Sequence, residues 1–256
     1  MHMLNPHCGV DRDPRGVVRL TICNAGPLNI FGSAAINGVR EGLETLAMDR
    51  DIRVLVIAGQ SERSLVGGAD IKEMVGFDPA SAEKFITGFR DACEAVRAFP
   101  GPVIARMPGW CLGGGLEVAA ACDFRVAAHD AKFGMPEVRV GIPSVIHAAL
   151  LPRLIGWGRA RWLVMTAENI DAATALAWGL IDRVAPSGEL DATVEQTIAM
   201  LLECSPEALR AQTALLRQWE ELPLKESVDL SIGVFGQAFL TGEPQRLMQQ
   251  FLDRKR

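Results

Sequence analysis

Two glutamates, Glu117 and Glu137, are the side chains of this sequence best suited to move protons. Glu117 follows three glycines at 113–115 and lies within the apolar run at 116–121, which predicts a buried helix. An unpaired carboxylate is costly there, so Glu117 needs a partner or a chemical role. Glu137 lies 137 − 117 = 20 residues later. Two carboxyl groups held close together tend to separate their pKa values, which suits acid and base catalysis. The alternative for each is an ordinary solvated glutamate.

Two glycine-rich segments, at 67–74 and 109–117, predict backbone that faces a ligand. Each follows a strand-like run and precedes a predicted helix, whose first N–H groups have no intrahelical partner and whose dipole is positive. Glycine lets a ligand approach such backbone closely. One N–H from each segment could bind a single developing negative oxygen. The alternative is two tight turns. Neither segment fits GxGxxG or GxxxxGK[ST], which disfavours a Rossmann or P-loop site.

Alternating strand and helix signals indicate which elements position these residues. The strand-like runs are residues 17–23, 53–58, 102–107 and 124–127. Spacings of three and four residues mark one amphipathic helix through Ile36, Val39, Leu43 and Leu46, and another through Phe85, Phe89, Cys93 and Val96. This alternation is typical of layered α/β folds.

The last third of the chain reads as helical, with breaks at Pro206, Pro223 and Pro244. We therefore expect an α/β body over residues 1–195 and a helical region over 196–256 that packs on the body or on another subunit. Apolar residues of this region predict a packed or intersubunit surface. They are Phe235, Phe239, Leu240, Leu247, Phe251 and Leu252.

Composition excludes several classes of partner. With 26 basic and 31 acidic residues, the net charge of −5 gives no reason to expect nucleic acid or an anionic membrane. Six scattered cysteines without a CxxC pair, and four unclustered histidines, favour a reduced, metal-free protein. The absence of a secretory leader and of an apolar run near ~20 residues favours a soluble, cytoplasmic protein.

The order of GADIKEM and then PGWCLGGGLEVAAACDFRVAAHDAKFGMPEVRVGIP closely resembles the crotonase (enoyl-CoA hydratase/isomerase) superfamily. Leu28-Asn29 and the segments 170–172 and 178–181 support the resemblance, which covers roughly residues 15–210. It implies a spiral of ββα units with a helical C-terminal region, assembled as trimers or hexamers. It also implies no metal and no nicotinamide, with coenzyme A entering only as part of the substrate.

The resemblance carries roles to individual positions. Glu117 and Glu137 would be catalytic, and the N–H groups of Ala69 and Gly114 would form the oxyanion hole. The substrate would also contact neighbouring backbone and side chains, namely Gly67, Gly68, Asp70, Ile71, Lys72 and Gly113. Lys72 is a candidate for a phosphate contact, or else a solvated helix lysine.

The chain departs from the family pattern at residues 147–150, where hydratases carry a glycine-rich segment with Thr-Gln-Arg, and at Ala167, which replaces a glycine. Gly67 also stands in place of a small residue such as alanine. The first departure predicts an altered acyl pocket. We interpret His147 as an exposed helix residue, the alternative being a polar group of that pocket.

The activity implied is that of a lyase of fatty acid metabolism, which reversibly hydrates a 2-enoyl-CoA to a 3-hydroxyacyl-CoA. The alternatives are enoyl-CoA isomerisation, acyl-CoA hydrolysis, or binding of a CoA thioester without catalysis. The sequence does not indicate which glutamate is the acid and which the base.

Overall fold

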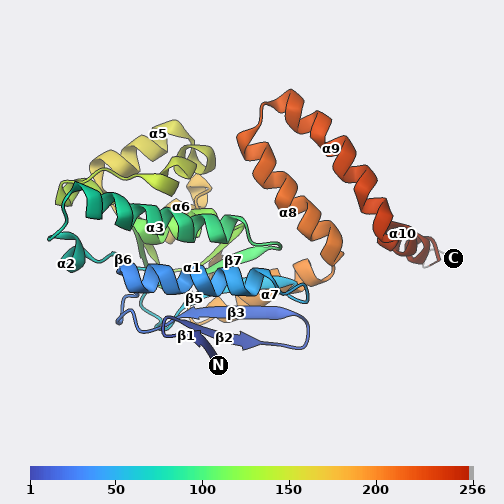
Figure 1. Ribbon diagram of the computed structural model, residues 1–256, viewed down its shortest axis with the longest axis horizontal. Helices are drawn as coiled ribbons and strands as arrows, with labels where there is room; N and C mark the ends of the chain where they lie inside the picture. Colours follow the sequence, from blue (N-terminus) through green and yellow to red (C-terminus); the bar gives the residue numbers. More distant parts are fainter. Residues whose placement is uncertain (254–256) are drawn as a thin grey trace.

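A seven-stranded sheet forms the centre of the computed structural model, which describes residues 1–253 (Figure 1). Its strands are β1 (His2–Asn5), β2 (Cys8–Arg12), β3 (Val17–Ile22), β5 (Val54–Gly59), β7 (Val103–Met107), β9 (Phe124–Ala128) and β12 (Arg183–Ala185), in that spatial order. β1, β2 and β3 pair antiparallel, and all later pairings in this sheet are parallel. The four strands predicted from the sequence are β3, β5, β7 and β9, so this prediction is confirmed.

After several of these central strands the chain adds a short strand in a second layer and then a helix. The short strands are β4 (Ile30–Phe31), β6 (Gly68–Ala69), β8 (Trp110–Leu112), β10 (Lys132–Gly134) and β11 (Ile170–Asp171). β4 pairs with β6, and β10 lies between β8 and β11. The helices that follow the first three are α1 (Ser33–Ala47), then α2 (Ile71–Met74) with α3 (Pro79–Arg97), and then α4 (Gly114–Ala121). This repetition is the predicted spiral of ββα units.

Side chains of the central sheet alternate between two hydrophobic cores. Leu55 and Ile57 of β5 face the core that α1 and α3 complete, whereas Val54 and Val56 face the core beneath α7 (Leu190–Leu202). The predicted apolar faces of α1 and α3 are both buried, which confirms those helices. Because both faces of the sheet are covered, its central parallel strand β5 has no polar side chain.

The chain between β10 and β12 forms short and interrupted helices. They are η1 (Glu137–Val140), η2 (Ile146–Leu150), α5 (Leu151–Thr166) and α6 (Ala172–Trp178). Gly156 breaks the helical backbone inside α5 with φ of 77°. Ala167 ends α5 with φ of 52°, a left-handed conformation that suits the glycine it replaces in the family pattern.

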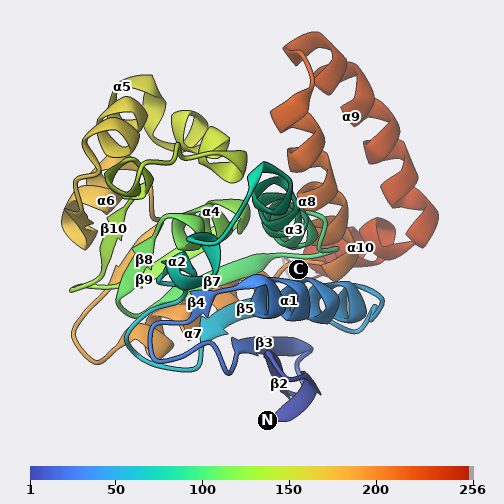
Figure 2. The same ribbon diagram turned by 60° about the vertical axis from the view of Figure 1, so that its left-hand side comes forward.

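The C-terminal helices extend from the body as a two-helix hairpin, which is followed by one further helix (Figures 1 and 2). They are α8 (Pro206–Glu221), α9 (Leu224–Ala238), η3 (Phe239–Thr241) and α10 (Glu243–Asp253). Each predicted proline break lies at the start of a helix, where proline is tolerated because the first N–H groups are unpaired anyway. The expected boundary at residue 195 falls inside α7, which packs on the sheet along its whole length. The extension therefore begins at α8.

Two further features bear on the sequence predictions. None of the helices in residues 1–253 is long and apolar enough to cross a membrane. All six cysteines are free thiols, and only Cys204 is exposed.

Candidate active site

Three consecutive short strands end beside one another, and each leads into a residue predicted to act in the site. Ala69 ends β6, Gly114 begins the helix after β8, and Glu137 begins η1 after β10. β8 and β10 are parallel, and the N–H of Gly113 donates to the carbonyl oxygen of Gly134 at 2.9 Å. Because equivalent ends of parallel strands meet at one edge, residues far apart in the sequence converge there.

A pocket of about 500 Å³ lies at this edge, a size typical of small-molecule sites. Seven of the predicted site residues line it, namely Gly67, Gly68, Ala69, Ile71, Gly113, Gly114 and Glu137. Its other walls are mainly apolar, from Met74, Val75, Leu112, Pro136, Val140 and Ile142, with the side chain of Arg139 added. The pocket can therefore surround an apolar chain and present backbone N–H groups to an oxygen at its end.

Two of these N–H groups, those of Ala69 and Gly114, are not used in the pairing of β6 with β4 or within α4. The N–H of Asp70 donates to the carbonyl oxygen of Phe31 at 2.9 Å. Because successive N–H groups alternate across a strand, that of Ala69 points away from β4. Gly114 is the first residue of α4, so its N–H has no acceptor within the helix and lies at the positive end of the helix dipole. Both groups suit the oxyanion-hole role, which stays a prediction.

Each glycine at 113–115 lies against a different neighbour. A Cβ at the first position would be 2.3 Å from Oε1 of Glu137, at the second 2.1 Å from the ring of Phe89, and at the third 2.0 Å from the carbonyl oxygen of Val66. The first also has φ of 53°, which L side chains rarely adopt. The triplet is thus more than a tight turn, because it lets the backbone of α4 approach three other segments.

Glu117 is buried on α4, with 4% of its surface exposed, as the apolar sequence around it predicts. Its Oε1 accepts a hydrogen bond from the N–H of Ala148 at 2.9 Å. Burial raises the pKa of Glu117 to about 8; the Ala148 N–H opposes this rise, and the charge of Glu137 adds to it. Glu117 is not among the residues that line the pocket, but it is near enough to Glu137 to feel its charge.

Glu137 is half-buried and lines the pocket directly. Its Oε2 accepts a hydrogen bond from the hydroxyl of Ser144 at 2.8 Å. The two partners of the glutamates, Ser144 and Ala148, were not predicted. Ala148 lies in the segment 147–150 that departs from the family pattern, and this departure is the signal in the sequence that could have indicated it. Ser144 precedes that segment, and no signal indicates it.

Asp70 and Lys72 lie apart from the pocket. The carboxylate of Asp70 caps α2 by accepting from the N–H groups of Lys72 and Glu73. The side chains of Asp70 and Lys72 contribute instead to a separate cavity of about 470 Å³ that also includes His7 and Asn24. Their roles in substrate binding stay predictions.

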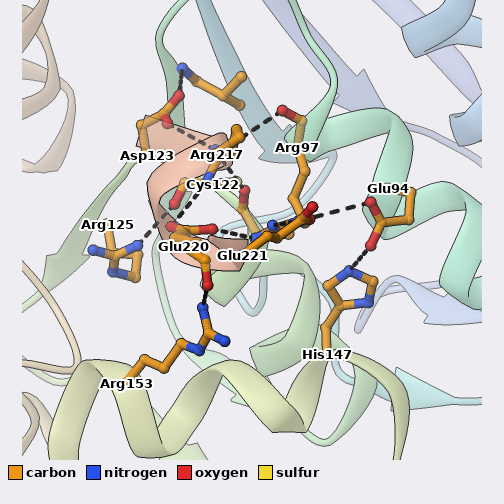
Figure 3. A network of polar contacts seen from close by, with 12 residues as sticks. Glu94, Arg97, Cys122, Asp123, Arg125, His147, Arg153, Arg217, Glu220 and Glu221 are labelled. Carbon is orange, nitrogen blue, oxygen red and sulfur yellow. Dashed lines mark hydrogen bonds and ion pairs between the residues drawn. The ribbon is translucent and has the colours of Figure 1, made fainter. Parts of the chain in front are cut away.

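The interpretation of His147 as an exposed residue is wrong. Only 6% of its surface is exposed, and its Nε2 lies 2.7 Å from Oε1 of Glu94 (Figure 3). The tight turn of η2 directs this side chain between α3 and α5. It does not line the pocket beside Glu137 either, since it contributes to a different cavity that includes Arg90 and Arg153.

Comparison with known proteins identifies the family of this chain. Residues 12–256 match the family model described as enoyl-CoA hydratase/isomerase. The chain belongs to the enoyl-CoA hydratase/isomerase family. Among curated members, a crotonyl-CoA hydratase of Syntrophomonas wolfei is 31% identical over 230 residues, which cover 90% of this chain and 88% of that protein. A probable enoyl-CoA hydratase of Mycobacterium bovis is 34% identical over 248 residues, with coverages of 96% and 95%.

Two solved structures have the same fold as this chain. The enoyl-CoA hydratase of Bacillus anthracis superimposes with a TM-score of 0.91 at 27% identity, over 97% of this chain and 96% of that one. The Pseudomonas aeruginosa protein DspI gives a TM-score of 0.87 at 32% identity, with coverages of 92% and 89%. The fold class predicted from the sequence is confirmed, and the protein is a crotonase-type enzyme by family.

Proposed function

We propose that the protein is a lyase that reversibly adds water to a 2-enoyl-CoA thioester and forms a 3-hydroxyacyl-CoA. The observation that carries this proposal is the pair of neighbouring glutamates, one of which is buried and has a pKa raised to about 8. Near neutral pH such a pair can hold one proton and one negative charge. The hydratase names of two curated relatives agree with it.

Water addition requires this combination. One carboxylate takes a proton from water as the water oxygen bonds to C3, and the protonated carboxyl delivers a proton to C2. Meanwhile the thioester oxygen accepts hydrogen bonds from the N–H groups of Ala69 and Gly114, which stabilise the enolate-like charge. Losing one such donor typically costs about 3–4 kcal/mol of barrier. In reverse, the same groups remove water from the 3-hydroxyacyl thioester.

Two structural features support a CoA thioester as the substrate. The mainly apolar walls of the pocket suit an acyl chain. Lys72 lines the separate cavity that also includes His7 and Asn24, and its ammonium group suits a phosphate of coenzyme A. The proposed chemistry uses no metal and no nicotinamide, and coenzyme A enters only as part of the substrate. A cytoplasmic location stays a prediction, with which the free thiols agree.

We further propose that the C-terminal helices assemble the protein into a trimer or hexamer. Leu224, Val228, Ile232 and Phe235 follow one another at helical spacing on α9 and are between 55% and 81% exposed. A continuous apolar stripe on a helix that projects from the body suits burial against another subunit.

Mass spectrometry of reactions with panels of enoyl-CoA and 3-hydroxyacyl-CoA substrates tests the activity. We expect gain or loss of one water with at least one acyl group. Double-bond migration without a mass change would instead indicate an isomerase, and release of free coenzyme A a thioesterase. Thioester binding without turnover across the panel would contradict the proposal and favour a non-catalytic binding protein.

A further inference from the structure

The position of Glu117 depends on a neighbouring segment rather than on its own helix. Among residues 1–253, its carboxylate has one hydrogen-bond donor, the N–H of Ala148 in η2. That N–H opposes the rise in the pKa of Glu117 that burial causes. The exact placement of η2 therefore affects both where the Glu117 carboxylate lies and how strongly it holds a proton.

η2 is poorly suited to hold that placement alone. It is a five-residue 3-10 helix, a form with weaker internal hydrogen bonds than an α-helix. Ile146, which begins it, has φ of 38°, a left-handed conformation that is strained for a β-branched residue. The Ala148 N–H also donates to the carbonyl oxygen of Val145 at 2.9 Å, so it is shared between its own turn and Glu117. Because strained backbone persists only where its surroundings fix it, contacts from outside η2 must help to hold this N–H in place.

The side chain next to Ala148 makes such a contact. His147 Nε2 donates to Oε1 of Glu94 on α3 at 2.7 Å, and His147 is 94% buried between the two segments. α3 also provides Phe89, whose ring lies against Gly114 at the start of α4. The same helix thus fixes both the glycine that begins α4 and the segment that binds Glu117.

A second contact fixes Glu94 in turn. Its Oε2 lies 3.7 Å from Nε of Arg97, and Nη1 of Arg97 lies 2.8 Å from Oε2 of Glu220 on α8 (Figure 3). Arg97 is itself buried, with 8% of its surface exposed. The network therefore extends from the C-terminal hairpin through α3 to η2.

We infer that His147, held by Glu94, is a positioning residue that keeps the Ala148 N–H on the carboxylate of Glu117. The inference builds on the proposed function, because it concerns the residue to which proton transfer is assigned there. The charged groups that face His147 come from three elements: Arg90, Glu94 and Arg97 from α3, Arg153 from α5 and Glu221 from α8. Glu117 itself faces Glu137, the N–H of Ala148 and the buried thiol of Cys93 on α3.

The test compares two replacements of His147. His147→Phe keeps a buried ring but removes the donor to Glu94, whereas His147→Gln can place an amide N–H near the position of Nε2. Neither replacement leaves the Glu94 carboxylate buried and unpaired, because 55% of the Glu94 side chain is exposed and can be hydrated. Nδ1 of His147 has no partner to lose. Both variants should therefore fold.

The measurement is infrared titration of the protonated carboxyl band of Glu117, identified as the band absent from Glu117→Gln. In His147→Phe we expect the pKa of Glu117 to rise by about half to one unit, the size of one hydrogen bond. In His147→Gln it should stay near the wild-type value.

Glu94→Ala should give the same rise in the pKa of Glu117 as His147→Phe, and the double variant should add no second rise. His129→Phe, the same change at an exposed residue, is the matched control.

A folded His147→Phe variant in which Glu117 titrates as in the wild type would overturn the inference. Because the infrared titration needs no substrate, it gives an answer even if the protein hydrates no enoyl-CoA. If it does hydrate one, the limb of the pH profile of kcat/KM assigned to Glu117 should move upward by the same amount in His147→Phe. Lower turnover without that movement would indicate a structural defect only.

Discussion

At the residue scale, Glu117 shows how a sequence can predict burial without predicting its partner. The apolar residues on both sides of it leave no solvated face on α4, so a buried carboxyl follows from the sequence. Its hydrogen-bond donor, Ala148, lies 31 residues away in a 3-10 helix that no periodic pattern indicates. For the same reason His147 was assigned to an exposed helix face.

The raised pKa of Glu117 predicts a dependence of stability on pH. Between its ordinary value of 4.5 and its folded value of about 8, the folded protein holds a proton that the unfolded chain releases. The contribution of Glu117 to stability is therefore complete below pH 4.5 and is lost as the pH rises through 8. Within that window the free energy of unfolding should fall by up to roughly 1.4 kcal/mol per pH unit from this group.

Urea denaturation at pH 5, 6 and 7 measures this slope. Glu117→Gln should lack the contribution, so the slope of the wild type should be steeper than that of the variant. Comparing the two removes contributions from other buried acids such as Asp123, whose pKa burial also raises. Equal slopes would mean that Glu117 is ionised in the folded protein near neutral pH.

Replacing either glutamate by glutamine should lower turnover at least ~100-fold, because each amide keeps the shape but cannot exchange a proton. Steady-state hydration assays with the best substrate from the panel measure the effect, and circular dichroism checks the fold. The Glu137→Gln amide can still accept from Ser144 through its oxygen, so packing at the pocket should be kept. Turnover near the wild-type rate in either variant would remove that residue from the mechanism.

At the element scale, the central strands and the two long helices of the body could be read from the sequence because each has a clear period or an unbroken apolar run. The short strands β4, β6 and β8 could not, since two or three residues carry no period. Yet β6 and β8 position the site, because they place the backbone of Ala69 and Gly114 at one edge. The glycine-rich motifs indicated this placement indirectly, because glycines mark the segments whose backbone can lie close to a ligand.

The alternation of N–H groups along β6 allows the oxyanion hole to be tested without breaking the strand. Ala69→Pro removes an N–H that points away from β4, so it should lower kcat about 10²–10³-fold with little loss of stability. Asp70→Pro removes both the N–H that donates to Phe31 and the carboxylate that caps α2, and should instead lower the melting temperature. Assays with any accepted acyl-CoA and thermal melts separate the two effects. Unchanged turnover in folded Ala69→Pro would exclude this N–H from the site.

At the scale of the whole molecule, the C-terminal hairpin exposes several large apolar side chains on α9. The sequence predicted its helices from their prolines, and an apolar surface from its composition. It did not indicate where the hairpin leaves the body, because α7 and α8 both carry apolar residues at helical spacing. In the structure α7 packs on the sheet along its length, and α8 adds its partly buried Leu209 to the same core.

Ile232→Glu tests whether the stripe on α9 is a subunit interface. Ile232 is 72% exposed, so the change should scarcely alter the folding of one chain but should place a charge within any interface formed by the stripe. We expect light scattering to give a trimer or hexamer for the wild type and smaller species for the variant. Gln237→Glu, at an exposed polar position of the same helix, is the control. A monomeric wild type at micromolar concentration would contradict the proposed assembly.

The spatial order of the seven central strands is also their order along the chain. During synthesis, each strand therefore leaves the ribosome after the neighbour with which it pairs, and the sheet can grow at one edge without opening an existing pair. α7, which closes the second face, follows β12 directly. The apolar stripe of α9 emerges only after this, so a nascent chain can complete its body before it presents the surface that other chains would bind.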